Sequence, residues 1–205
     1  MKKNPYPGKL IAFEGLDGSG LTTQAKLLKN FLEAKGVNVI LTKEPTQESS
    51  VAKEIQEILS HKKEMDPFEF QKLFAKDREE HLNNVIIPAL EQNKWVISDR
   101  YAFSSFAFGA KNEKEMEEII KLNENFLMPD LVVFLKVSPE ICIERIKKRG
   151  EEMKLFEKKE KLEKVFQNYL KLQNRFTNFE IIDGEKSIEE VSKQIQNIIQ
   201  SKFNL

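Results

Sequence analysis

The residues best suited to chemistry lie in a glycine-rich turn that follows an apolar segment. The chain runs from residues 10–13 through Gly15 and Gly20 to Thr22. Glycine lets backbone amides approach an anion closely, and amides at the start of a helix converge on that anion. The spacing Gly15-x-x-x-x-Gly20-x-Thr22 follows the Walker A pattern, in which the threonine hydroxyl binds Mg²⁺. The pattern predicts a phosphate-binding loop.

Two residues of this turn do not suit simple phosphate binding. Leu21 stands where the pattern has a lysine. Asp17 is an acid, which would repel phosphate unless a metal ion or a sugar hydroxyl lies beside it. The turn alone therefore leaves two interpretations open: a nucleotide site with one cation replaced, or a strand-to-helix turn that binds nothing. The lysines that could supply the missing charge are Lys43, Lys147, Lys148 and Lys154.

An acid and a base end a second apolar segment. Asp99 and Arg100 follow residues 95–98, at the edge where α/β sheets bind ligands. Asp99 could hold Mg²⁺ or its water, and the planar guanidinium of Arg100 suits a phosphate on either side. The alternative for this pair is a salt bridge that closes the strand.

A charged residue interrupts an apolar stripe on a predicted helix. Phe70, Phe74, Arg78, Leu82 and Ile86 are four residues apart and share one helical face. Burial of an unpaired charge is unfavourable, so Arg78 needs either a partner or a polar cavity. Alternatively, its long side chain reaches solvent across the aromatic rings.

Short apolar segments alternate with longer segments of helical period, and this order must position the residues above. The expected strands are residues 9–13, 38–42, 95–98, 131–137 and 179–182. The expected helices span about 20–35, 51–60, 67–91, 112–126, 139–149, 157–175 and 187–201. Strands separated by helices predict a three-layer α/β/α fold, with a five-stranded parallel sheet flanked by helices. At 205 residues, one domain over 1–205 is expected.

Composition narrows the class of protein. Lys+Arg and Asp+Glu number 33 each, so no overall field attracts the protein to nucleic acid or to an anionic membrane. The start of the chain lacks the pattern of a signal peptide, and no run of eighteen apolar residues occurs. We therefore expect a soluble, cytoplasmic protein with no nucleic-acid or membrane partner.

The chain resembles the thymidylate kinase family of P-loop nucleoside monophosphate kinases along nearly its whole length. The motifs that carry the resemblance stand in family order at 13–20 (FEGLDGSG), 42–45 (TKEP), 73–78 (LFAKDR), 99–101 (DRY), 129–131 (PDL), 145–149 (RIKKR) and 181–184 (IIDG). The order and spacing are more specific than any one motif. The resemblance implies a P-loop NTPase-type fold and ATP-dependent phosphorylation of dTMP to dTDP, with Mg²⁺ as cofactor.

The resemblance also implies roles for individual residues. The catalytic residues are expected to be Asp17, Asp99, Arg100 and Arg149, and the metal ligands Thr22 and Asp99. The ATP phosphates are expected to contact Gly15, Gly18, Ser19, Gly20, Leu21, Thr22, Thr23 and Arg145, with the adenine beside Asp183 and Gly184. dTMP is expected to contact Glu44, Pro45, Phe74, Arg78, Arg100, Ser104, Ser105 and Phe108. Residues 149–157 are expected to form a mobile lid over ATP, and a homodimer is usual in the family.

Two alternatives remain beside a working dTMP kinase. One is a catalytically weak paralogue that binds nucleotide and acts as a regulator, which Leu21 and Leu155 favour because both lie in the expected donor half. The other is a kinase for a different nucleoside monophosphate or for a deoxynucleoside. The metal and acceptor residues found together argue against the first, and Phe74 with Arg78 argues against the second.

Overall fold

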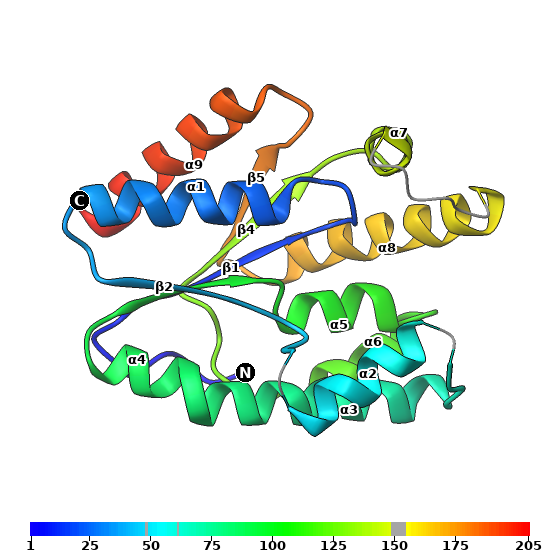
Figure 1. Ribbon diagram of the computed structural model, residues 1–205. Helices are drawn as coiled ribbons and strands as arrows, with labels where there is room; N and C mark the ends of the chain where they lie inside the picture. Colours follow the sequence, from blue (N-terminus) through cyan, green and yellow to red (C-terminus); the bar gives the residue numbers. More distant parts are fainter. Residues whose placement is uncertain (48, 61, 149–154) are drawn as a thin grey trace.

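A five-stranded parallel sheet forms the centre of the molecule in the computed structural model, which describes residues 1–47, 49–60, 62–148 and 155–205 (Figure 1). The strand order is β2-β3-β1-β4-β5. The strands are β1 (Leu10–Gly15), β2 (Val39–Lys43), β3 (Trp95–Asp99), β4 (Leu131–Lys136) and β5 (Phe179–Asp183). Every residue of β1 is buried, as expected for the central strand of a sheet covered on both faces.

Helices cover both faces of the sheet. They are α1 (Leu21–Ala34), α2 (Ser50–Leu59), α3 (Pro67–His81), η1 (Leu82–Ile86), α4 (Ile87–Glu91), α5 (Ala102–Gly109), α6 (Glu113–Leu122), α7 (Pro139–Lys148), α8 (Leu155–Arg175) and α9 (Ile188–Phe203). Helices α1 and α9 pack on one face, and Figure 1 shows α4, α5 and α8 on the other. The three-layer α/β/α fold expected from the sequence is confirmed.

The register of the sheet brings three strand ends together. Asp99 lies opposite Phe13 of β1 on one side and opposite Lys43 of β2 on the other. Because all of these strands are parallel, their carboxyl ends share one edge of the sheet, where the glycine-rich turn leaves β1. Residues separated by more than fifty positions in the chain therefore meet at this edge.

The strands and most helices expected from the sequence are present, but α5 was not expected. Its sequence, AFSSFAFG, has no amphipathic period, because α5 is buried beneath α6 and α8 rather than lying at the surface. The long helix expected over 67–91 contains the π-helical segment η1, which precedes Pro88. Proline lacks the N–H that would continue the α-helical bonding, and this explains the wider turn.

Part of the expected lid cannot be placed. Residues 149–154 lie outside the described residues, and 155–157 form the start of α8. In the part of the chain that the structure describes, no helix is both long and apolar enough to cross a membrane.

Candidate active site

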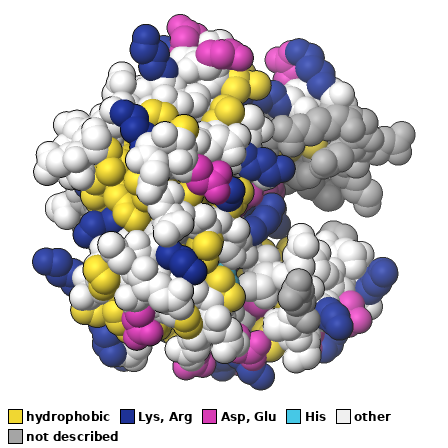
Figure 2. Space-filling model, turned by 60° about the vertical axis from the view of Figure 1, so that its left-hand side comes forward, with side chains coloured by type: hydrophobic (Ala, Val, Ile, Leu, Met, Phe, Trp, Pro, Cys, Tyr) yellow, Lys and Arg dark blue, Asp and Glu magenta, His cyan; other side chains and the backbone are white. Residues whose placement is uncertain are grey.

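The glycine-rich turn forms the floor of a cavity at the carboxyl edge of the sheet. Gly20 caps α1 with φ 101°, a left-handed conformation that favours glycine. At Gly18 a Cβ atom would lie 2.7 Å from the carbonyl oxygen of Cys142, so no side chain fits there. The cavity measures about 230 Å³, and Lys43, Asp99 and Arg100 complete its wall. Figure 2 shows a deep hollow on this side of the molecule, with Lys and Arg side chains on its inner wall.

The polar side chains of the loop fit phosphate and a hard metal ion. Ser19 Oγ is buried and has no hydrogen-bond partner among the described residues, so it is free to donate to an anion. The Thr22 hydroxyl donates to Asp99 Oδ2 over 2.6 Å. Hydroxyl and carboxylate oxygens suit Mg²⁺, which usually takes one or two protein ligands and completes its shell with water and substrate phosphates. The residues present therefore fit a Mg²⁺ ion bound together with a nucleotide.

The acid in the loop has a cationic partner. Arg100 donates to Asp17 Oδ1 over 2.8 Å, to the carbonyl oxygen of Gly15 over 3.0 Å and to Ser104 Oγ over 3.0 Å. Burial alone would lower the pKa of Arg100, but the negative charge of Asp17 and its neighbours raises the pKa above its ordinary value. The arginine therefore stays charged and is held over the turn. The salt bridge expected as the alternative for Arg100 exists, but with Asp17 rather than with Asp99.

The backbone of Arg100 is strained. Its φ of 73° lies in the left-handed region, which an arginine seldom adopts. The chain is held there because Arg100 N–H donates to Phe13 O over 3.0 Å and Ser98 Oγ donates to Arg100 O over 2.6 Å. Such strain is typical of functional sites, where surrounding contacts fix an unusual conformation.

Leu21 and Lys43 both line the cavity but come from different elements. Leu21 is only 5% exposed and packs with the apolar side chains between α1 and the sheet. Lys43 projects from the end of β2, with its Nζ 3.5 Å from Asp99 Oδ2. It also lines a neighbouring cavity of about 630 Å³ between α1, β2 and the end of α3, which shares Thr22 and Asp99 with the first. Among the lysines that the structure describes, Lys43 is therefore the one that borders the loop cavity.

Glu14 is a buried acid that holds residues of this site in place, and it was not singled out from the sequence. Its buried carboxylate accepts hydrogen bonds from Tyr101 N–H, from the N–H and hydroxyl of Ser104, and from Tyr169 OH. Burial raises the pKa of Glu14 to about 7, although these donors and the charge of Arg100 lower it. The carboxylate fixes the start of α5, and thus the serine that contacts Arg100. A charged residue directly before the glycine-rich turn was the signal available in the sequence.

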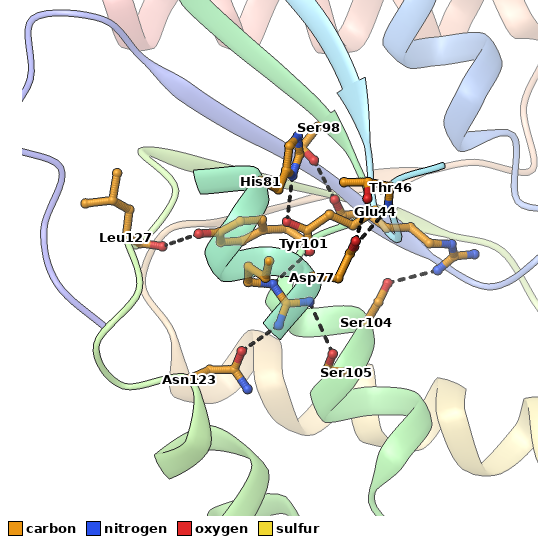
Figure 3. A network of polar contacts seen from close by, with 12 residues as sticks. Glu44, Thr46, Asp77, His81, Ser98, Tyr101, Ser104, Ser105, Asn123 and Leu127 are labelled. Carbon is orange, nitrogen blue, oxygen red and sulfur yellow. Dashed lines mark hydrogen bonds and ion pairs between the residues drawn. The ribbon is translucent and has the colours of Figure 1, made fainter. Parts of the chain in front are cut away.

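Arg78 is the centre of a buried polar network. Figure 3 labels Glu44, Ser105 and Asn123 among the members of this network. Arg78 is 2% exposed. Its guanidinium donates to Glu44 Oε2 over 2.7 Å, to Asn123 Oδ1 over 2.5 Å and to Ser105 Oγ over 3.2 Å. The ring of Tyr101 lies 5.3 Å from its central carbon. The expectation that Arg78 needs a partner is confirmed, and the alternative that it reaches solvent is wrong. With five N–H groups and three acceptors among the described residues, Arg78 has two further N–H groups that make no hydrogen bond to this part of the chain.

The same network holds the segment after β2. His81 Nδ1 lies 3.0 Å from Glu44 Oε1, and its Nε2 lies 2.6 Å from Thr42 Oγ1. Asp77 accepts from Thr46 N–H over 2.8 Å and also from the Thr46 hydroxyl. These contacts fix Pro45, which follows a cis peptide bond. Neither His81 nor Asp77 was singled out from the sequence, because their partners lie 28 to 39 residues away.

The remaining expected residues fall into two groups, one on α3 and α5 and the other on α7 and at the end of β5. Phe74 is half-buried on the face of α3 that carries Arg78, and the ring of Phe108 lies 5.2 Å from the guanidinium carbon of Arg100. In the second group, Arg145 donates to Gly184 O over 3.0 Å and to Ser19 O over 3.4 Å. Asp183 is exposed at the end of β5. Arg149 and Lys154 lie outside the described residues.

Comparison with known proteins gives a consistent result. The family model described as thymidylate kinase matches residues 13–195. The chain is 38% identical to a protein named probable thymidylate kinase from Pyrococcus horikoshii, over 96% of this chain and 98% of that protein. It is also 38% identical to a thymidylate kinase from Desulfotalea psychrophila, over 92% of this chain and 93% of that protein. A thymidylate kinase from Caldicellulosiruptor saccharolyticus is 36% identical, with 94% and 96% covered.

Proposed function

The chain belongs to the thymidylate kinase family and is therefore a phosphotransferase, and we propose that its site transfers the γ-phosphoryl group of ATP to dTMP, giving dTDP. The observation that carries the proposal is the pairing of half-buried Phe74 with buried Arg78, one helical turn apart on α3. An aromatic face next to a guanidinium with two unused donors is suited to a planar base that carries carbonyl oxygens.

The acceptor nucleotide is proposed to bind between α3, α5 and the segment after β2. Phe74 stacks on the base, and Arg78 donates to one of its carbonyl groups. Ser105, Glu44 and Pro45 line this side, while Phe108 packs near the sugar. Support comes from the Arg78 network, which fixes Glu44 and Ser105 within hydrogen-bond distance of one guanidinium. A pocket built in this way rejects bases that would leave its buried donors unpaired.

The phosphates are proposed to lie over the glycine-rich turn. The amides from Gly15 to Thr23 and the unpaired Ser19 hydroxyl bind the phosphates of ATP. Thr22 and Asp99 hold Mg²⁺, which on binding neutralises charge on the phosphate oxygens. Arg100 lies between the two nucleotides and stabilises the transferring group, while Asp17 orients Arg100 through their ion pair. This division follows from phosphoryl transfer, in which positioning and charge stabilisation supply most of the catalysis.

Lys43 is the proposed substitute for the lysine that the loop lacks. Loss of one preorganised charge of this kind lowers the rate by about 10²–10³, so an active site needs a cation at this place. Lys43 lies within 3.5 Å of Asp99 and borders the loop cavity. Lys147 and Lys148 are exposed on α7, and Lys148 pairs with Glu144 over 2.7 Å. These contacts favour Lys43 over both of the α7 lysines.

The donor nucleotide is proposed to lie between the turn and the end of β5. Arg145 supports this arrangement, because it joins the loop at Ser19 to Gly184 through two carbonyl oxygens. Asp183 and Gly184 are placed beside the adenine. Arg149, within the proposed lid at 149–157, is expected to add a second cation when the lid closes and excludes water.

A cytoplasmic homodimer is the proposed state of the protein. Large apolar side chains are exposed on the helices that follow β2, with Leu59 50%, Phe68 36% and Val85 40% exposed. Exposed apolar side chains on these helices suit an interface with a second copy. The molar mass in solution, measured by light scattering, tests this part.

The experiment that tests the function is a coupled ADP-release assay with ATP and Mg²⁺. The acceptors are dTMP, dUMP, dGMP, CMP and thymidine. The proposal predicts turnover with dTMP that exceeds turnover with each of the others. Preference for another acceptor would overturn the substrate assignment while leaving the phosphotransferase assignment intact.

A further inference from the structure

Gln71 of α3 carries a buried polar atom with no hydrogen-bond partner. The residue is 7% exposed, and its Oε1 accepts no hydrogen bond from any described residue. A buried acceptor without a partner is unfavourable, and in native proteins nearly all such groups are satisfied. A ligand that brings a donor to this position would satisfy it.

The Gln71 carboxamide packs against Gly109 of α5. A Cβ atom at Gly109 would lie 2.6 Å from Gln71 Cδ and 2.8 Å from its Nε2. Gly109 does not adopt a left-handed φ, so its backbone does not require glycine. A side chain at position 109 would instead displace the Gln71 carboxamide and would also meet Ile119 Cδ1, which lies 2.9 Å from that Cβ position.

Gln71 shares the face of α3 that holds the proposed base site. Gln71, Phe74 and Arg78 are three and four residues apart, so they lie on the same side of the helix. Gln71 abuts Gly109, and Arg78 donates to Ser105, one turn earlier on α5. The carboxamide and the guanidinium therefore face the same stretch of α5, with the half-buried ring of Phe74 between them along α3. A base stacked on that ring would turn its edge toward both groups.

We propose that Gln71 is a specificity-determining residue that reads the N3–H group of the thymine ring. This inference rests on the proposed function, in which Phe74 and Arg78 hold that base. Thymine carries one N–H donor between two carbonyl oxygens. Gln71 Oε1 accepts from N3–H, and an N–H of the same carboxamide can donate to an adjacent carbonyl. Cytosine has an acceptor at N3, which would face Oε1 without a proton between them.

The test varies both the Gln71 side chain and the N3–H group that it is proposed to bind. kcat/KM is measured for dTMP and for N3-methyl-dTMP, which lacks the N3 proton, with the wild type and with Gln71→Ala. The matched control is Lys72→Ala, which removes an exposed neighbour on the same helix. The wild type should prefer dTMP by at least about 100-fold, the upper range for an unpaired buried group. In Gln71→Ala this preference should fall at least about 10-fold, because dTMP loses its acceptor while the methyl group gains room.

A merely structural glutamine would give a different result. Both substrates would then lose the same factor in Gln71→Ala, and the preference would stay at the wild-type value, which would overturn the inference. Gly109→Ala is a second variant that keeps Gln71 but displaces its carboxamide, and it should reduce the preference in the same direction. An unchanged preference in Gly109→Ala would also contradict the inference. Absence of dTMP turnover in the wild type would instead overturn the proposed function together with the inference.

Discussion

The ammonium of Lys43 lies 3.5 Å from the Asp99 carboxylate oxygen that also accepts a hydrogen bond from Thr22. The sheet creates this relationship, because Lys43 and Asp99 are opposite each other on the parallel strands β2 and β3. The lysine charge is thereby brought near the glycine-rich turn from β2, which is separated from β1 by β3, rather than from the turn itself. Leu21 meanwhile packs in the apolar layer beneath α1.

Replacement of Lys43 should impair catalysis more than binding of the acceptor. We expect Lys43→Ala to lower kcat about 10²–10³-fold, the usual effect of removing one preorganised charge from a transition state. Steady-state kinetics with dTMP and ATP measure this effect. Lys148→Ala, which removes an exposed lysine of α7, is the control and should change kcat less than about twofold.

A lysine at position 21 should restore part of the rate that is lost in Lys43→Ala. Leu21 borders the cavity as well as the core, so the long side chain in Leu21→Lys can place its ammonium in the cavity. In the Lys43→Ala background, Leu21→Lys should raise kcat at least about tenfold. Two results together would show that the charge comes from elsewhere. Lys43→Ala would keep a kcat close to that of the wild type, and the double variant would be no faster than Lys43→Ala.

Removal of Arg78 should strongly destabilise the fold. Arg78→Ala leaves the buried Glu44 carboxylate without its cation, and breaking a buried pair in this way costs about 3–5 kcal/mol. The matched variant Lys76→Ala lies two residues earlier on an exposed position and should change the free energy of unfolding by no more than about 0.5 kcal/mol. Urea unfolding compares the two, and equal stabilities would contradict the buried network.

The elements of the fold could be predicted from the sequence because each has its own local pattern. All five strands and the glycine-rich turn were expected near their observed bounds. Helix α5 was not expected, since a buried helix rich in Phe and Ser has no amphipathic period. It carries Ser104, Ser105 and Phe108, whose roles came from the family resemblance alone.

The partners within the site could not be predicted, because they depend on how distant segments pack. Arg78 was known to need a partner, but Glu44 and Asn123 lie 34 and 45 residues away in the chain. The Asp17–Arg100 ion pair spans 83 residues. The strand register places Lys43 opposite Asp99, and no local pattern in the sequence predicts this. Periodicity describes one element at a time and contains no information on which faces of two elements meet.

The Glu14 carboxyl should make stability depend on pH. Burial raises its pKa from 4.5 to about 7, so between these values the folded chain binds more protons than the unfolded chain. Stabilisation by Glu14, relative to the non-titrating variant Glu14→Gln, should be complete below pH 4.5 and lost as pH rises through 7. The change should approach about 3 kcal/mol, since each pKa unit is worth about 1.4 kcal/mol.

Urea unfolding of the wild type and Glu14→Gln from pH 4.5 to pH 8 measures this difference. The other titrating groups are common to both proteins, so the difference between them isolates Glu14. A difference in the free energy of unfolding that does not change with pH would show that Glu14 keeps an ordinary pKa in the folded protein.

The proposed Mg²⁺ site predicts that loss of the Thr22 hydroxyl raises the Mg²⁺ concentration needed for catalysis. Thr22→Ala removes one of the two proposed protein ligands and leaves Asp99 without its hydrogen bond. We expect the Mg²⁺ concentration for half-maximal rate to rise about 10- to 100-fold, as is typical when a metal site loses a supporting group. Thr177→Ala, an exposed threonine near β5, should leave it unchanged. An unaltered Mg²⁺ requirement in Thr22→Ala would exclude this ligand set.

The most direct test of the central claim is the kcat/KM of the wild-type protein for each phosphate acceptor, measured as diphosphate product formed from ATP in the presence of Mg²⁺. The account predicts conversion of dTMP to dTDP, with kcat/KM at least about 100-fold above the values for CMP and dGMP, because these bases do not match the donors and acceptor around Phe74. Turnover at the background rate with every acceptor would contradict it.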